Sequence, residues 1–180
     1  LQYMNLAVIG SGGREHALCY KLQQSKKLGK LICIPGNAGT EKIAKNIDVN
    51  IRDFEEIYKI IKKNNIDMVV IGPEEPLVNG ITDYLKKKSV RVFGPDKFAS
   101  QLEGSKAFMK NLCKKNNIPT AGYGIFNEWD EAKKFIDKIG VPIVVKADGL
   151  AAGKGVTVCQ SLEEAKIKTK EILSGKFRSS

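Results

Sequence analysis

The 180-residue sequence has no apolar run of the roughly 18 or more residues that a membrane-spanning helix needs. Its first residues, 1–5, run straight into an apolar segment and resemble neither a signal peptide nor an arginine-rich transit peptide. We therefore expect a cytoplasmic protein without membrane attachment.

Ligands for metal ions are also scarce, with one histidine and four cysteines in the chain. The cysteines, Cys19, Cys33, Cys113 and Cys159, are far apart and form no CxxC pair, whereas a zinc site needs clustered ligands. We expect buried, reduced thiols, as is usual in a cytoplasm, and no metal ligands in this chain. The histidine, His16, has an open role, because a lone histidine on a first helical turn more often packs or hydrogen-bonds than acts as a base.

Positive charge is in excess, with a formal net charge of +10. The lysines form short runs within or at the ends of predicted helices, where they suit the negative end of the helix dipole and stay in water. These runs are 26–27, 62–63, 86–88, 114–115 and 133–134. We interpret them as solvated surface that would also suit phosphorylated substrates. Nucleic-acid binding is disfavoured because no recognition helix or aromatic stacking motif accompanies the charge.

Strand and helix patterns alternate through the first hundred residues. Short apolar runs predict strands at 6–9, 31–34, 68–71 and 90–93, and apolar residues at helical spacing predict helices at 14–24, 54–63 and 78–88. Continuous apolar runs of this length are typical of strands buried on both faces of a parallel sheet. We therefore predict a doubly wound α/β domain over residues 1–101.

Each predicted strand ends in a turn rich in glycine or proline, at 10–13, 35–39, 72–76 and 94–95. Ligands of doubly wound sheets bind beyond the carboxyl ends of the strands. The four turns should therefore converge on one ligand-binding edge.

The pattern changes after about residue 101. We expect a linker helix at 104–116 with Phe108, Met109 and Leu112 facing inward, and an α+β subdomain from about 120 to 180. In it, strands are predicted at 123–126, 143–146 and 156–159, and helices at 128–139 and 162–173. This second part, 102–180, has few elements for an independent core.

The first glycine turn follows a strand and opens a helix, as anion-binding turns do. A dinucleotide fingerprint would need a third glycine where Glu15 stands, and an acid after the second strand, which ends Pro35-Gly36-Asn37. Nicotinamide and flavin binding are thus disfavoured, whereas a phosphate or carboxylate ligand suits the Arg14 fork. The alternative is that the glycines only make a tight turn.

A second glycine-rich segment, 148–155, lies between two predicted strands. It is not a P-loop, because its glycine spacing is one residue short and Gly155 replaces the Ser or Thr that would hold magnesium. A loop of small residues can fold over a triphosphate and offer N–H groups and Lys154 to it, with Lys146 pointing into the same cavity. Ser105 is expected to cap a helix and bring Lys106 to the nucleotide. The alternative is an ordinary surface hairpin.

Seven segments together resemble the phosphoribosylamine–glycine ligase family of ATP-grasp enzymes, in family order and over nearly the whole chain. They are GSGGREHA (10–17), PGNAGT (35–40), GPEEPLVNGI (72–81), FGP (93–95), LEGSKAFMK (102–110), IPTAGY (118–123) and PIVVKADGLAAGKGV (142–156). The resemblance implies an N-terminal substrate-side domain followed by the start of an ATP-grasp domain with a small lid.

The same resemblance implies ligation of glycine to 5-phosphoribosylamine, with ATP split to ADP and phosphate. The glycine carboxylate is phosphorylated and the acyl phosphate is attacked by the amine, so no catalytic nucleophile on the enzyme is expected. The implied ATP contacts are Lys106, Lys146, Asp148, Gly149, Ala151, Ala152, Gly153, Lys154 and Gly155. The implied substrate contacts are Gly10, Gly12, Gly13, Arg14, Glu15, Pro35, Gly36, Asn37, Gly72, Pro73 and Glu74.

The family also has a nucleotide-holding acidic segment, ligands for Mg²⁺ or Mn²⁺ and a C-terminal domain, which we expect downstream of residue 180. We accordingly expect no turnover from these 180 residues alone. We also expect the protein to be a monomer. Two alternatives stay open: a non-catalytic module that binds a phosphorylated metabolite, and a different ATP-grasp enzyme such as a related purine carboxylase.

Overall fold

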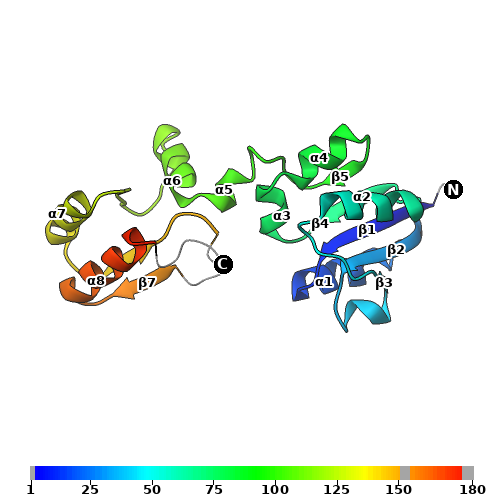
Figure 1. The fold of residues 1–180 in the computed structure, drawn as a ribbon, viewed down its shortest axis with the longest axis horizontal. Helices are drawn as coiled ribbons and strands as arrows, with labels where there is room; N and C mark the ends of the chain where they lie inside the picture. Colours follow the sequence, from blue (N-terminus) through cyan, green and yellow to red (C-terminus); the bar gives the residue numbers. More distant parts are fainter. Residues whose placement is uncertain (1–2, 151–154, 176–180) are drawn as a thin grey trace. The chain divides into compact units, whose positions relative to one another are not determined.

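A computed structural model describes residues 3–150 and 155–175 of the chain (Figure 1). The chain divides into two compact units, Leu1–Gln101 and Leu102–Ser180. No helix among the described residues has the length and apolar character needed to cross a membrane.

The first unit is built on a five-stranded sheet in which every pairing is parallel. Its strands are β1 (Met4–Gly10), β2 (Leu28–Pro35), β3 (Lys45–Asn46), β4 (Met68–Ile71) and β5 (Arg91–Phe93), in the order β3-β2-β1-β4-β5. The predicted parallel α/β arrangement is confirmed. The sequence pattern missed β3, because two polar residues carry no apolar signal.

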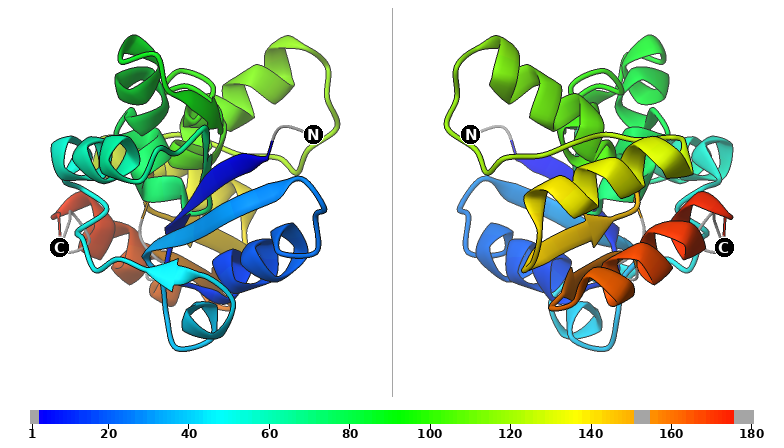
Figure 2. Two further views of the ribbon diagram at one scale, coloured as in Figure 1. Left: turned by 90° about the vertical axis from the view of Figure 1, so that its right-hand side faces the viewer. Right: turned by 90° about the vertical axis from the view of Figure 1, so that its left-hand side faces the viewer.

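Helices cover both faces of this sheet (Figure 2). On one face, α1 (Gly13–Leu22) packs Cys19 against Val8 of β1 and Cys33 of β2. On the other face, α2 (Phe54–Lys63) and α4 (Ile81–Lys87) pack against the apolar side chains of β1, β2 and β4. The central strands are therefore buried on both sides, as their continuous apolar runs predicted.

Helix α2 shows why the local sequence folds as it does. The Asp53 side chain accepts a hydrogen bond from the Glu56 amide (2.9 Å) and so caps the first turn. Ile57, Ile60 and Ile61 lie on one helical face, and all three are buried in the core. The helix has the predicted bounds.

The helix predicted at 78–88 corresponds to α4, which begins three residues later, at Ile81, and a separate short helix, α3 (Glu74–Val78), precedes it. Gly80 separates them with a φ of 91°, in the left-handed region that favours glycine. Helix α3 occupies part of the segment expected to be a turn. The pattern of apolar residues continued through Gly80 and so hid the break.

The second unit contains one antiparallel hairpin, formed by β6 (Ile143–Lys146) and β7 (Val156–Cys159). Helices α7 (Trp129–Ile139) and α8 (Leu162–Leu173) lie side by side and bury Ile136, Cys159 and Ala165 with the hairpin (Figure 2). This matches the predicted α+β subdomain. The remaining elements are the 3-10 helix η1 (Thr40–Lys42) in the first unit, α5 (Gln101–Gly104) at the boundary, and α6 (Lys106–Lys115) in the second.

Two expectations for the second unit are wrong. Residues 123–126 form no strand: the Tyr123 hydroxyl donates to the Lys110 carbonyl oxygen (3.1 Å) of α6, and no neighbouring strand pairs with this segment. The inward face expected for α6 is only half-buried, since Phe108, Met109 and Leu112 are all partly exposed.

The lysine runs are exposed, as expected of solvated surface. The four cysteines are free thiols, and three of them, Cys19, Cys33 and Cys159, are buried. The hydrogen bond with Cys33, together with burial, raises the pKa of the Cys19 thiol. Burial likewise raises the pKa of Cys159. Cys113 departs from the expectation, because it is half-buried at the end of α6.

The difference in burial predicts selective alkylation. Under native conditions a maleimide should modify Cys113 first, because this residue is only half-buried, while the other three thiols are buried and protected. Mass spectrometry of peptides after timed labelling measures this order. In urea all four should react at similar rates. Equal labelling of Cys19 and Cys113 in the folded protein would contradict the described packing.

Candidate functional site

The candidate site lies where the order of the sheet reverses direction. The chain passes from β1 to β2 on one side of the sheet and then returns to β4 on the other side of β1. Ligands of doubly wound folds bind at this switch point, beyond the carboxyl ends of the strands. The Gly72 amide donates to the Ile9 carbonyl (3.0 Å) and the Gly36 amide to the Gly10 carbonyl (3.1 Å), so three of the predicted turns meet there.

A cavity of about 260 Å³ opens between the turns after β1 and β4. It is lined by Ser11, Gly12, Arg14, Glu15, Ile51, Pro73 and Glu74. The cavity thus brings together Gly12, Arg14, Glu15, Pro73 and Glu74 from the predicted substrate contacts. Ile51 was missed, and nothing in its local sequence marks it, because it follows β3 in a loop before α2.

Arg14 joins the two sides of this cavity. Its guanidinium donates to the Gly72 carbonyl oxygen (2.6 Å) and to the Glu74 carboxylate (2.9 Å). The backbone amide of Glu74 and the Arg14 guanidinium hold the pKa of the Glu74 carboxyl below its ordinary value. Both side chains are exposed to water, at 58% and 38%, so the ion pair is screened and contributes little to stability. Its consequence is orientation of the guanidinium at the mouth of the cavity.

Glu15 differs from the other predicted contacts because it is only 4% exposed. Its carboxylate accepts a hydrogen bond from the Gly12 amide (2.7 Å), the backbone half of a helix capping box. A Cβ atom at Gly72 would lie 2.0 Å from a Glu15 carboxylate oxygen, and one at Gly10 would lie 2.6 Å from the Glu15 side chain. Glu15 therefore fills the space that the two glycines leave. Its role as a substrate contact stays a prediction.

The predicted turn at 35–39 is tied to the turn at 10–13 by Asn37. The Asn37 amide nitrogen donates to the Ser11 (2.9 Å) and Gly12 (3.2 Å) carbonyl oxygens. Its side-chain oxygen accepts from the Gly39 (2.8 Å) and Thr40 (2.9 Å) amides. Pro35, Gly36 and Asn37 do not line the cavity, so they support its wall from behind.

Thr40 and Asn46 complete this support and were missed by sequence reasoning. The buried Thr40 hydroxyl donates to the Asn46 side-chain oxygen (2.7 Å), and the Asn46 amide donates to the Asn37 carbonyl (2.8 Å). His16 is exposed on α1, and its ring lies so close to Gly39 that a Cβ there would be 2.8 Å away. The His16 ring thus packs against the turn at Gly39.

The predicted nucleotide residues gather separately, within the second unit. The Asp148 carboxylate accepts from the Lys106 amide (2.7 Å), and the Lys106 ammonium donates to the Gly149 carbonyl (2.8 Å). Lys146 ends β6 opposite Val156 and is exposed, and Gly155 directly precedes β7. Ala151, Ala152, Gly153 and Lys154 lie outside the described residues.

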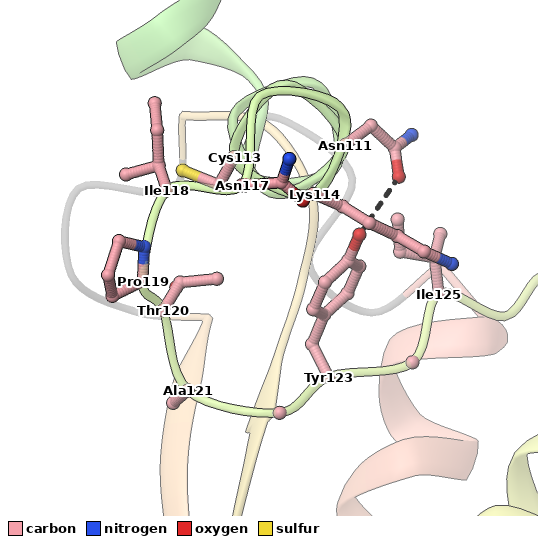
Figure 3. Close-up of a pocket in the computed structure, with 12 residues that line it drawn as sticks. Asn111, Cys113, Lys114, Asn117, Ile118, Pro119, Thr120, Ala121, Tyr123 and Ile125 are labelled. Carbon is pink, nitrogen blue, oxygen red and sulfur yellow. Dashed lines mark hydrogen bonds between the residues drawn. The ribbon is translucent and has the colours of Figure 1, made fainter.

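A larger hollow in the second unit, of about 770 Å³, is a poorer candidate (Figure 3). It lies between the end of α6 and residues 117–125, where the Tyr123 hydroxyl contacts the Asn111 side chain (3.3 Å). It contains no residue predicted to bind ligand. We therefore place the candidate sites at the switch point and at the base of the 148–155 loop.

No cluster of three or more His, Cys, Asp or Glu side chains suited to a metal ion occurs in residues 3–150 and 155–175. The described residues thus offer lysines and backbone amides for an anion and no set of ligands for a cation.

Comparison with known proteins assigns the chain to a class. Residues 4–103 match the model for the N domain of phosphoribosylglycinamide synthetase, and residues 104–180 match its ATP-grasp (A) domain. The chain is thus part of an ATP-grasp protein. More narrowly, it belongs to the phosphoribosylglycinamide synthetase family.

Individual relatives agree with this assignment. The chain is 49% identical to phosphoribosylamine–glycine ligase of Mesorhizobium japonicum over 174 residues, covering 97% of this chain and 41% of that protein. It is 47% identical to the enzyme of the same name from Clostridium acetobutylicum, covering 96% of this chain and 42% of that protein. The chain thus spans about two fifths of the length of the curated relatives it matches.

Solved structures show the same fold. The phosphoribosylamine–glycine ligase of Thermotoga maritima is 34% identical and superposes with a TM-score of 0.79, over 97% of this chain and 40% of that one. The biotin carboxylase domain of a 2-oxoglutarate carboxylase from Hydrogenobacter thermophilus has a TM-score of 0.75 at 21% identity, over 99% of this chain and 43% of that one. The second likeness shows the fold alone.

The contact between Glu15 and Gly72 predicts a large steric effect. Gly72→Ala should lower the free energy of unfolding by about 1–3 kcal/mol, because the new methyl group must displace a buried, hydrogen-bonded carboxylate. Gly13→Ala is the matched control, since a Cβ there meets no atom within 4 Å and alanine favours the helix. Urea denaturation compares the two variants. A Gly72→Ala protein as stable as the parent would show that Glu15 can move aside freely.

Proposed function

We propose that the full-length protein ligates glycine to 5-phosphoribosylamine, with ATP split to ADP and phosphate. The family match over both units carries this proposal. The geometry supports it, because a glycine turn that opens a helix at the switch point suits a phosphorylated substrate, and Lys106 beside the base of the 148–155 loop suits ATP.

The cavity at the switch point is the proposed site for 5-phosphoribosylamine. Its phosphate carries negative charge, which suits the positive end of the α1 helix dipole and the oriented Arg14 guanidinium. The substrate amine suits the acidic side of the same cavity, where Glu74 is held ionised by its hydrogen bonds. The set proposed to form this wall is Gly10, Gly12, Gly13, Arg14, Glu15, Pro35, Gly36, Asn37, Gly72, Pro73 and Glu74.

The base of the 148–155 loop is the proposed ATP side. Lys106 and Lys146 would neutralise phosphate charge, and the loop from Gly149 to Gly155 would cover the triphosphate, with Asp148 at its base. The resemblance to the family implies that the ligands for Mg²⁺ or Mn²⁺ lie downstream of residue 180, and we propose the same for the full-length protein.

The chemistry then follows from positioning and charge neutralisation. The terminal phosphoryl group of ATP passes to the glycine carboxylate, giving ADP and an acyl phosphate. The amine of 5-phosphoribosylamine attacks the acyl carbon, an amide bond forms, and phosphate leaves with its electron pair. No residue of the chain needs to bond to an intermediate. We further propose that the protein works in the cytoplasm as a monomer on these small molecules, with neither nucleic acid nor a membrane involved.

Release of ADP tests the proposed reaction. The full-length protein should release ADP from ATP and magnesium only when both glycine and freshly generated 5-phosphoribosylamine are present. A coupled assay for ADP, with each co-substrate omitted in turn, measures this requirement. Release with a different acceptor would reassign the substrate within the ATP-grasp class. A folded protein that binds the metabolites without release would instead be a binding module.

A substitution tests the ATP side separately. Lys146→Ala should lower the rate of ATP use at least about tenfold, because one charge that stabilises the transferring phosphoryl group is lost. Lys138→Ala is the matched control, since Lys138 is an exposed lysine on α7 of the same unit. Steady-state rates at fixed glycine and amine compare the two. An unchanged rate in Lys146→Ala would remove this lysine from the site.

A further inference from the structure

Asp148 makes an unusual connection at the start of α6. Its carboxylate accepts hydrogen bonds from the Lys106 amide (2.7 Å), the Ala107 amide (3.3 Å) and the Ser105 hydroxyl (3.0 Å). Ser105 in turn caps the helix by accepting from the Phe108 amide (3.1 Å). Two of the amide groups that a helix leaves unpaired in its first turn thus donate to a residue more than forty positions along the chain.

A second connection lies directly beside the first. The Lys106 ammonium donates to the Gly149 carbonyl (2.8 Å), and the Ala147 amide donates to the Gly155 carbonyl (2.7 Å) across the base of the loop. The main chain at 147–149 is therefore fixed both to α6 and to the far side of the hairpin. Lys106 and the beginning of the glycine-rich loop cannot move independently while these bonds persist.

The charge of Asp148 argues against direct contact with a triphosphate. A carboxylate would repel the phosphate oxygens, and this one already accepts hydrogen bonds from three donors at the positive end of a helix dipole. Burial opposes ionisation of this group, yet the hydrogen bonds from Ala107 and Ser105 outweigh it and hold the pKa of Asp148 below its ordinary value. At neutral pH the Asp148 carboxylate is thus ionised and hydrogen-bonded to the first turn of α6.

We propose that Asp148 is a positioning residue, which holds Lys106 and the start of the 148–155 loop in the arrangement that receives ATP, and that it does not touch the nucleotide. This inference rests on the proposed ATP-dependent function. It gives Asp148 a different role from Lys106 and Lys146, with which the sequence analysis grouped it as a contact of ATP. We call the contacts of Asp148 with Ser105, Lys106 and Ala107 the loop clamp.

Two substitutions of Asp148 in the full-length protein test the loop clamp. Asp148→Ala removes every acceptor and should raise the KM for ATP about tenfold or more, because misplacement of phosphate-binding groups is costly, while the KM for glycine stays unchanged. In Asp148→Asn the amide oxygen still accepts from the helix and the amide nitrogen can donate to Ser105. Only the charge at the helix end is lost, so this variant should stay within about fivefold of the parent.

The matched control is Asp130→Ala, which removes a carboxylate from the first turn of α7 in the same unit. It should leave the KM for ATP unchanged. Ser105→Ala removes one donor of the loop clamp and should raise the KM for ATP in the same direction by a smaller factor. This variant also keeps the test decisive if Asp148→Ala does not fold.

Hydrogen exchange of peptides that cover residues 104–109 gives a readout independent of turnover. Exchange should accelerate in Asp148→Ala and remain near the parent rate in Asp148→Asn. An unchanged KM for ATP in both Asp148→Ala and Ser105→Ala would overturn the proposal, as would Asp148→Asn impaired as severely as Asp148→Ala. If the parent itself releases no ADP, the proposed function fails; if the parent is active and these variants match it, only the loop clamp fails.

Discussion

The position of β1 at the centre of a parallel sheet is the constraint on which the first unit depends. Because β2 and β4 pair with opposite edges of β1, the turns that follow them must pass on either side of the turn after β1. The space between the turns after β1 and β4 is the candidate substrate cavity. Arg14 and Asn37 then join the turns by hydrogen bonds. These bonds and the buried sheet together hold the residues that line the cavity in place.

Much of this fold was predictable because its signals are local. The apolar runs at 68–71 and the amphipathic spacing at 54–63 require no knowledge of distant residues, and both elements have the predicted bounds. The errors arose where tertiary context decides. Residues 123–126 have strand-like composition but no strand to pair with, and the apolar spacing at 78–88 gave no sign that Gly80 would take a left-handed φ.

The candidate site was predictable in location but less so in the roles of its residues. Convergence of the glycine turns follows from parallel topology alone. The sequence could not separate residues that face the cavity, such as Arg14, from residues that shape it from behind, such as Asn37. Contacts such as that between Asp148 and α6 join positions more than forty residues apart, and no spacing rule reports them.

Glu15 and Gly72 have a consequence for how this family can vary over time. The carboxylate occupies the space that a side chain at position 72 would need, and it holds the Gly12 amide in place. A change at either position alone is therefore penalised, by a clash in one case and by an emptied space in the other. Homologues that differ at one of these positions should carry a compensating difference at the other. The two positions are therefore expected to covary, although 57 positions separate them in the sequence (72 − 15).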